Sequence, residues 1–286
     1  MVEVPFYWLD IFTSNPFKGN PAAVCLIKTD LEDALYQNIA KELGLSETAF
    51  AEKIGENEYK LRWFTPEMEM PLCGHATIAT AYTLNTEYGV PSPIMFHTLS
   101  GEMKVEVDEN RVTLNFPFFS FNKTNDDRIM EAVGVEDYEE IRYTDNPPAY
   151  TAILREEKQV KELKPDFNRL RELCTELGVM GLIVTSPASL PYDYAYRTFA
   201  PGAGVDEDQG TGIVQCAIAS YWKDRLGKNV MRSIQYSERV SEMDVEVIDE
   251  GVRITGSATP LIKGTILIKQ SFTEQMFNFL QSSDDN

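Results

Sequence analysis

The sequence has few histidines and cysteines, and far fewer basic than acidic residues. Its 286 residues include two histidines, four cysteines, 26 lysines and arginines, and 45 aspartates and glutamates. No two cysteines have the C-x-x-C spacing, which argues against a zinc site or a disulfide framework. The formal net charge of −19 repels phosphate groups and anionic lipids, so we expect neither nucleic acid nor a membrane as a partner.

Long apolar runs are missing too. No apolar stretch reaches the ~18 residues that a membrane-spanning helix needs. The first ten residues, MVEVPFYWLD, contain two acids and lack the basic region of a signal peptide. We therefore expect a cytoplasmic protein with reduced thiols. The chain also lacks G-x-G-x-x-G after a strand and G-x-x-x-x-G-K-[ST], which argues against a dehydrogenase or an NTPase.

Four short patterns occur twice in the same order and predict that the chain is a duplication. The first is a helix with apolar residues every three or four positions, predicted over 31–43 and again over 167–177. An aspartate before each copy, Asp30 or Asp166, is expected to cap its N-terminus, and a glycine ends each copy.

The other three patterns follow in the same order in both halves. They are R-x-F-x-P at 62–66 and 197–201, a charge-free segment at 70–86 and 209–222, and E-M-x-V-E-V at 102–107 and 242–247. Gly74 and Gly212 are predicted to begin the helices of the charge-free segments, and a helix without a charged face is normally buried on all sides. Each E-M-x-V-E-V copy alternates apolar and charged residues before a turn, which is typical of a β-hairpin.

Together the patterns predict an α+β fold with two pseudo-symmetric halves. Each half is expected to be a mixed or antiparallel, barrel-like sheet wrapped around a central buried helix. We place the halves at residues 1–122 and 123–286, because the chain turns polar between 118 and 128. The extreme C-terminus is expected to pack back on the first half.

The two glycines that begin the central helices indicate a binding site. Free backbone N–H groups and the dipole at a helix start favour an anion. If the two halves are related by pseudo-symmetry, the helix starts at Gly74 and Gly212 can face each other across one cleft. We therefore predict a carboxylate-binding pocket between them; the alternative is that these glycines only permit close packing.

Glu47 is a candidate functional carboxylate. It lies in the segment GLSETAF, which follows a helix stop and precedes an apolar strand, so it is predicted at a helix–strand junction. The equivalent residue of the second half is Gly181. The scaffold is thus duplicated and the carboxylate is not. The pattern alone does not distinguish a functional glutamate from an exposed loop residue.

Four segments resemble one known family. They are DIFTSNPFKGNPAAV at 10–24, LSETAF at 45–50, RWFTPEMEMPLCGHATIA at 62–79 and FAPGAGVDEDQGTG at 199–212. These blocks are similar to the PhzF family, the phenazine-biosynthesis-like isomerases, and the similarity runs along nearly the whole chain. The resemblance implies the diaminopimelate epimerase fold, in agreement with the repeat.

The resemblance also implies roles for site residues. Glu47 matches the glutamate that moves a proton between carbon atoms of the substrate, and His75 and Asp208 match a catalytic histidine and aspartate. The implied activity is a cofactor-independent isomerisation, without a metal, of a small carboxylic or cyclic amino acid. We expect an apolar pocket to raise the pKa of Glu47 toward neutrality. The family commonly forms homodimers, so a homodimer is expected here.

The remaining predicted site residues bind the substrate rather than react with it. They are Cys73, Gly74, Thr211, Gly212 and Ile213. Ile213 departs from the family pattern E-D-P-x-T-G-S, which has serine at this position. A serine could donate a hydrogen bond to the substrate, whereas isoleucine adds apolar bulk. We therefore expect a ligand with an apolar edge.

Two alternatives remain at this point. A racemase or epimerase of the diaminopimelate type uses two facing cysteines, and Cys73 occupies the first position but Thr211 the second. Threonine is far too weak an acid to replace a thiol, so Cys73 is interpreted as a small packing residue. The other alternative is a non-catalytic binding protein on a degenerate isomerase scaffold.

Overall fold

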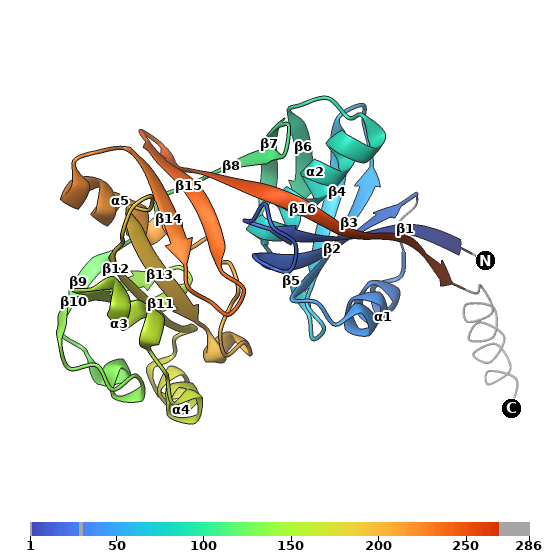
Figure 1. Cartoon of the computed structure of the whole chain (residues 1–286). Coiled ribbons are helices and arrows are strands. Elements are labelled where there is room, and N and C mark those ends of the chain that lie inside the picture. Colours follow the sequence, from blue (N-terminus) through green and yellow to red (C-terminus); the bar gives the residue numbers. More distant parts are fainter. Residues whose placement is uncertain (1, 29–30, 269–286) are drawn as a thin grey trace, which may run out of the picture.

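The computed structural model describes residues 2–28 and 31–268, which form two lobes (Figure 1). The first lobe contains β1 (Val2–Ile11), β2 (Asn20–Ile27), α1 (Asp33–Leu43), β3 (Glu47–Lys53), β4 (Glu58–Phe64), β5 (Glu69–Met70), α2 (Gly74–Tyr88), β6 (Ile94–Thr98), β7 (Gly101–Asp108) and β8 (Arg111–Phe116). None of the helices described in either lobe is long and apolar enough to cross a membrane.

The second lobe follows, and one long strand returns from it to the first. Its elements are β9 (Asn122–Thr124), η1 (Arg128–Ala132), β10 (Tyr138–Asp145), β11 (Pro148–Leu154), α3 (Glu157–Glu162), α4 (Phe167–Leu177), β12 (Gly181–Pro187), β13 (Tyr194–Phe199), η2 (Pro201–Ala203), α5 (Gln215–Leu226), β14 (Val230–Gln235) and β15 (Ser241–Ile248). The returning strand is β16 (Gly251–Ile268), which runs across both lobes in Figure 1.

Strand β16 closes the sheet of the first lobe. The strand order β1-β2-β3-β4-β6-β7-β8-β16 returns to β1, so eight strands form a closed ring. Residues 252–255 of β16 pair with β8 on one side and β15 on the other. Residues 258–268 then pair with β1. One strand therefore belongs to the sheets of both lobes.

Both lobes repeat the same strand pairings. The pairs β2–β3 and β11–β12 are parallel, and so are β4–β6 and β13–β14. Each lobe then ends in an antiparallel hairpin, β7–β8 or β15–β16, whose first strand carries the E-M-x-V-E-V pattern. The predicted α+β fold with a duplicated architecture is confirmed.

Helix α4 agrees with the sequence prediction in both bounds and caps. The Asp166 carboxylate accepts hydrogen bonds from the N–H groups of Asn168, at 3.1 Å, and Arg169, at 3.0 Å. Gly178 ends the helix in the left-handed region at φ 66°. That conformation costs residues with a Cβ roughly 1–2 kcal/mol, which explains a glycine here.

Helix α1 differs from the prediction at its start. It begins at Asp33, two residues later than expected, and its N-cap is Glu32, which makes no capping hydrogen bond through its side chain. Asp30, the predicted cap, lies outside the described residues. The C-terminal prediction is confirmed, because Gly44 ends α1 at φ 65°.

The R-x-F-x-P motif carries an ion pair in each lobe. Arg62 donates from Nε and Nη2 to the Glu69 carboxylate at 2.7 and 2.8 Å, and Arg197 donates to Glu207 at 2.7 and 2.9 Å. Each guanidinium also lies over the phenylalanine of its own motif. The motif therefore fastens the end of a strand to the segment that follows.

The first central helix, α2, is buried inside the ring. Most of its side chains pack in the main core, including Ile78 and Ala79, which are fully buried. Its polar side chains are satisfied locally: the hydroxyls of Thr77, Thr80 and Thr83 donate to backbone carbonyls four residues earlier, at 2.6 to 2.8 Å. The middle of the helix thus tolerates a dry environment.

The second central helix begins later than predicted. We expected Gly212 to begin it, but α5 begins at Gln215. The carbonyls of residues 212–214 accept hydrogen bonds from N–H groups only three residues further on, at 3.0 to 3.1 Å, so these residues form a tight turn. The Thr211 N–H is held by Oε1 of Gln235, at 2.6 Å, which fixes the chain before the turn.

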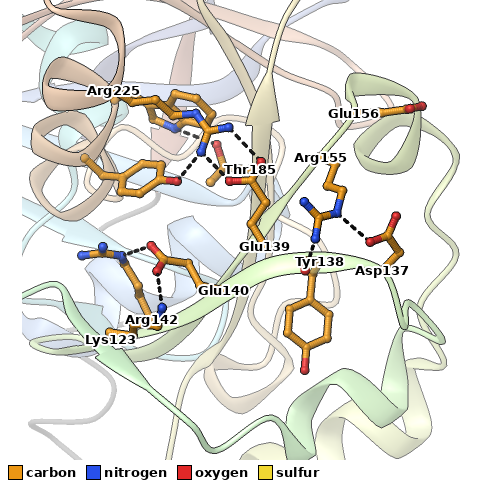
Figure 2. Close-up of polar contacts among 12 residues, drawn as sticks. Lys123, Asp137, Tyr138, Glu139, Glu140, Arg142, Arg155, Glu156, Thr185 and Arg225 are labelled. Carbon is orange, nitrogen blue, oxygen red and sulfur yellow. Dashed lines mark hydrogen bonds and ion pairs between the residues drawn. The ribbon is translucent and has the colours of Figure 1, made fainter.

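The far end of α5 is attached to the sheet of the second lobe (Figure 2). Arg225 donates from Nη2 to Glu139 of β10 at 2.8 Å and from Nη1 to the Tyr221 hydroxyl at 2.8 Å. Trp222, fully buried, donates to the Thr185 hydroxyl of β12 at 3.0 Å. These contacts fix the helix whose other end approaches the candidate site.

Candidate active site

Three predicted residues of the first lobe form a line of polar contacts. Glu47 is the first residue of β3, His75 lies in the first turn of α2, and Cys73 is the N-cap of that helix. The Glu47 Oε2 atom is 3.1 Å from His75 Nε2, and the Cys73 Sγ atom is 3.5 Å from His75 Nδ1. Only 18% of the Glu47 side chain and 7% of the His75 side chain are exposed.

Glu47 and His75 stabilise each other's charged forms. Burial raises the pKa of Glu47, but the charge and hydrogen bond of His75 outweigh it, and the net pKa lies below the ordinary 4.5. Burial lowers the pKa of His75, but Cys73 and Glu47 outweigh it, and the net pKa lies well above 6.5. The expected rise of the Glu47 pKa toward neutrality is therefore wrong, because a cation rather than an apolar wall faces the carboxylate.

The Cys73 thiol has a raised pKa. Burial raises its pKa above the ordinary 9.0, the Glu47 charge raises it further, and His75 opposes both. A thiol acts as a base or nucleophile only as the thiolate. The interpretation of Cys73 as a small buried residue beside the imidazole is consistent with these surroundings.

The same three residues are the only group among the described residues with the spacing of a metal site. Their donor atoms lie within 4.8 Å of one another. However, Cys73 contacts Nδ1 and Glu47 contacts Nε2, on opposite edges of the ring. One ion binds one imidazole nitrogen, so all three ligands reach it only if a side chain moves. The arrangement suits proton transfer along a line better than metal binding.

Asp208 is the candidate carboxylate of the second lobe. Its Oδ2 atom accepts a hydrogen bond from the Thr211 hydroxyl at 2.5 Å, and its Oδ1 atom accepts one from Nδ2 of Asn20 at 2.9 Å. Its backbone carbonyl accepts from Nε2 of Gln235 at 2.6 Å. Because Asn20 belongs to β2 of the first lobe, Asp208 is held by both lobes.

Two residues that the sequence analysis missed connect the candidate carboxylates. The Ser46 hydroxyl lies 3.4 Å from His75 Nε2 and 3.3 Å from Asn20 Oδ1. Asn20 in turn contacts Asp208. The polar network therefore runs from Glu47 and His75 through these two residues to the second lobe. Both missed residues lie inside the segments that carry the family resemblance, GNPAAV and LSETAF, which was the available signal.

The comparisons with known proteins identify the family. A model of the phenazine biosynthesis-like proteins, PhzC-PhzF, matches residues 9–264. The chain belongs to this PhzF family. An uncharacterized isomerase of Pseudomonas aeruginosa is similar, with 37% identity over 268 residues, covering 93% of this chain and 99% of the relative. A phenazine biosynthesis-like domain-containing protein 2 of Mus musculus is 36% identical over 289 residues, covering 93% and 99%.

Solved structures agree with the PhzF assignment. A PhzF family protein of Enterococcus faecalis superposes with a TM-score of 0.87 at 35% identity, covering 93% of this chain and all of that one. The predicted family is thus confirmed, and the predicted class of enzyme, an isomerase of the PhzF family, agrees with the names of the relatives.

The remaining predicted residues of the PhzF-type site have different surroundings. Gly74 begins α2, as predicted, and a Cβ on it would make an ordinary contact with the Phe116 ring at 3.6 Å. A Cβ on Gly212 would lie 3.3 Å from Phe12, which is tight. Ile213 is partly buried and packs against the main core. Packing explains the glycine at 212 at least in part, and the carboxylate pocket between the two segments stays a prediction.

Gly181, the counterpart of Glu47 in this PhzF-family chain, leaves no space for a side chain. It begins β12 as Glu47 begins β3. A Cβ built on Gly181 would lie 1.8 Å from the carbonyl oxygen of Phe199. The second lobe thus excludes every other side chain at this position.

One cavity lined by residues that the structure describes lies outside the predicted site. It has a volume of about 620 Å³ and lies beside the segment that carries Asp208. Lys161, Lys164, Arg197, Glu207 and Tyr236 are among the residues that line it. None of the predicted PhzF-type site residues does, so this cavity is separate from the site.

Proposed function

We propose that the protein is a cofactor-independent isomerase that moves a proton between two carbon atoms of a small carboxylic acid. Glu47 is the acid and base. One observation carries the proposal: a largely buried glutamate, still partly open to solvent, is paired with the imidazole of His75 at 3.1 Å. The lowered pKa of this carboxylate means that it begins the reaction ionised, as a base.

The proton transfer balances without another reactant. The Glu47 carboxylate takes a proton from one carbon, and the electron pair spreads into the conjugated system of the acid. The protonated carboxyl group then returns the proton to a different carbon. No electrons leave the substrate, so no redox partner is required.

The neighbouring groups have supporting roles in the proposal. Protonated His75 holds Glu47 through Nε2 and provides positive charge for a substrate carboxylate in a chain of net charge −19. Asp208, with one oxygen on Asn20 and the other on Thr211, is positioned to accept a hydrogen bond from an amine or hydroxyl of the substrate. Together they favour a small acid that also carries a polar hydrogen.

Replacing Glu47 with glutamine tests the proposal. Small carboxylic acids are first screened for an increase in melting temperature with the wild-type protein. Each acid that binds is then incubated in deuterated water, and its carbon-bound deuterium is measured by NMR. We expect exchange with the wild type and none with Glu47→Gln, which still binds the acid because an amide keeps the size of the carboxyl group.

Three outcomes would contradict the proposal. Exchange that persists in Glu47→Gln would assign the base elsewhere. Loss of exchange in Cys73→Ser, with activity retained in Glu47→Gln, would favour a thiol-dependent epimerase. Binding of an acid whose protons never exchange with the wild type would leave a binding protein on an isomerase scaffold. Assembly as a homodimer also stays a prediction, which sedimentation analysis tests separately.

A further inference from the structure

Arg239 crosses from the second lobe into the first. It lies between β14 and β15, and its guanidinium contacts the end of β1 and the segment between β1 and β2. The Nη2 atom donates to the Asp10 carboxylate at 2.6 Å and to the carbonyl of Lys18 at 3.0 Å. The Nε atom donates to the carbonyl of Gly19 at 2.9 Å. One side chain therefore holds three points of the 10–19 segment.

The partner of Arg239 is a completely buried carboxylate. None of the surface of Asp10 is exposed, against 28% of the Arg239 side chain. The second oxygen of Asp10 accepts the Phe17 N–H at 2.7 Å. An aspartate so deeply buried needs its cation, because an unpaired buried charge is strongly destabilising.

Backbone hydrogen bonds from the residues that follow Arg239 add to this contact between the lobes. The Gly19 N–H donates to the carbonyl of Val240 at 2.9 Å, and the Glu242 N–H donates to the carbonyl of Phe12 at 2.8 Å. Gly19 has φ +68°, and a Cβ there would lie 2.1 Å from the carbonyl oxygen of Ile11. The 10–19 segment is thus held in one conformation against the second lobe.

The residue that follows this segment is Asn20. It is fully buried, and Nδ2 donates to Asp208 at 2.9 Å and to the carbonyl of Gly210 at 3.0 Å. These two bonds use both hydrogens of the amide. The position of Asn20 relative to Asp208 therefore depends on how the preceding ten residues are anchored across the lobes.

We propose that Arg239 is a positioning residue that, through Asp10 and the 10–19 segment, holds the Asn20 amide against the Asp208 carboxylate. The inference rests on the proposed function only in that Asp208 is assigned to the site. Arg239 fixes the orientation of that carboxylate indirectly, through residues of the first lobe, without touching it. The two lobes are thereby coupled at the point where their polar networks meet.

The side-chain amide of Asn20 reports on this coupling without a substrate. Its NMR signals are identified by their loss in Asn20→Ser, and their hydrogen exchange with water is measured. In Arg239→Met we expect the two protons to exchange about tenfold faster or more, because the amide is no longer held. Millimolar guanidinium should restore slow exchange in Arg239→Ala, whereas sodium chloride at equal ionic strength should not.

Arg62→Met is the matched control. Arg62 makes a bidentate ion pair of similar length within the first lobe, and its side chain is 15% exposed. This variant should leave the Asn20 signals unchanged. Unchanged exchange in Arg239→Met, or an equal change in Arg62→Met, would overturn the proposal.

Arg239→Lys keeps the test decisive if Arg239→Met does not fold. Lysine retains the positive charge near Asp10. However, it has a single nitrogen in place of the guanidinium nitrogens that donate to the carbonyls of Gly19 and Lys18. Exchange of the Asn20 amide must still be faster than in the wild type, and wild-type exchange in this variant would contradict the inference. The Asn20 measurement uses no substrate, so a negative result would not bear on the proposed role of Glu47. Likewise, a negative result in the deuterium experiment on Glu47 would not bear on the proposed role of Arg239.

Discussion

At the scale of single residues, the imidazole of His75 organises the first half of the candidate site. It contacts a carboxylate on one edge and a thiol on the other. The carboxylate and imidazole stabilise each other's charged forms, which is why their pKa values move in opposite directions. The pair therefore links the stability of the fold to pH.

The sign of this link follows from the two pKa values. The lowered pKa of Glu47 contributes stability above pH 4.5, and this is lost as the pH falls through the folded-state pKa. The raised pKa of His75 contributes stability below pH 6.5, and this is lost as the pH rises through its folded-state pKa. We predict that Glu47→Gln lowers the free energy of unfolding most between pH 4.5 and 6.5, as measured by urea denaturation across pH.

Glu58→Gln is the control for that measurement. Glu58 also contacts a histidine, His97, at 3.0 Å, but its side chain is 55% exposed. Exposed pairs contribute about 0–1 kcal/mol, so this variant should differ little from the wild type. A loss of stability in Glu47→Gln that does not vary with pH would show that the buried pair is not charged as described.

Ile213 gives a second prediction at this scale. Because its side chain packs partly against the main core, Ile213→Ser should lower the free energy of unfolding by about 1–2 kcal/mol. It should also strengthen the binding of acids with a polar edge. Ile262→Ser, at a half-exposed position, should change the unfolding free energy by less than about 0.5 kcal/mol. Equal effects of the two changes would mean that Ile213 does not contribute to packing.

At the scale of elements, the two outer helices offer a paired experiment. They are the same length, but only α4 has an N-cap side chain that accepts hydrogen bonds. Asp166→Ala should lower the free energy of unfolding by about 1 kcal/mol, whereas Glu32→Ala should have almost no effect. Urea denaturation of both variants checks this, and similar losses would indicate that Asp166 acts through something other than capping.

The bounds of these elements show what the sequence could predict. The spacing of apolar residues, together with Asp166 and Gly178, predicted both ends of α4 correctly. Both ends could be predicted because an N-cap and a terminal glycine act on residues close to them in the sequence. The start of α5 was wrong by three residues. A hydrogen bond from Thr211 to Gln235, which lies 24 positions further along the chain, fixes the chain before the turn, and no local pattern reveals such a contact.

The same limit applies to the candidate site. Glu47, His75 and Asp208 were found through the family resemblance, and Glu47 and His75 are brought together. Asn20 and Arg239 were not predicted, because their partners lie 188 and 229 residues away in the sequence. Their roles arise from the docking of two lobes, which composition and periodicity do not specify.

At the scale of the whole molecule, β16 makes the lobes interdependent. Residues 1–122 contain seven of the eight strands of the closed ring, and the eighth is β16. We predict that the isolated fragment 1–122 does not fold, because an open ring exposes its core and two unpaired edges. Its NMR spectrum should lack dispersion and should gain it when fragment 123–286 is added. A dispersed spectrum from 1–122 alone would show that this half is autonomous.

Gly181 has a consequence for the history of the molecule. After a duplication, both copies of a site are at first free to change, and a lost residue can return by a single substitution. Here the backbone of β13 occupies the space that a side chain at 181 would need. A glutamate at 181 would require the neighbouring strand to shift, which a single substitution at this position does not achieve. The difference between the two lobes at this position, glutamate in one and glycine in the other, therefore cannot be removed by a single substitution at 181.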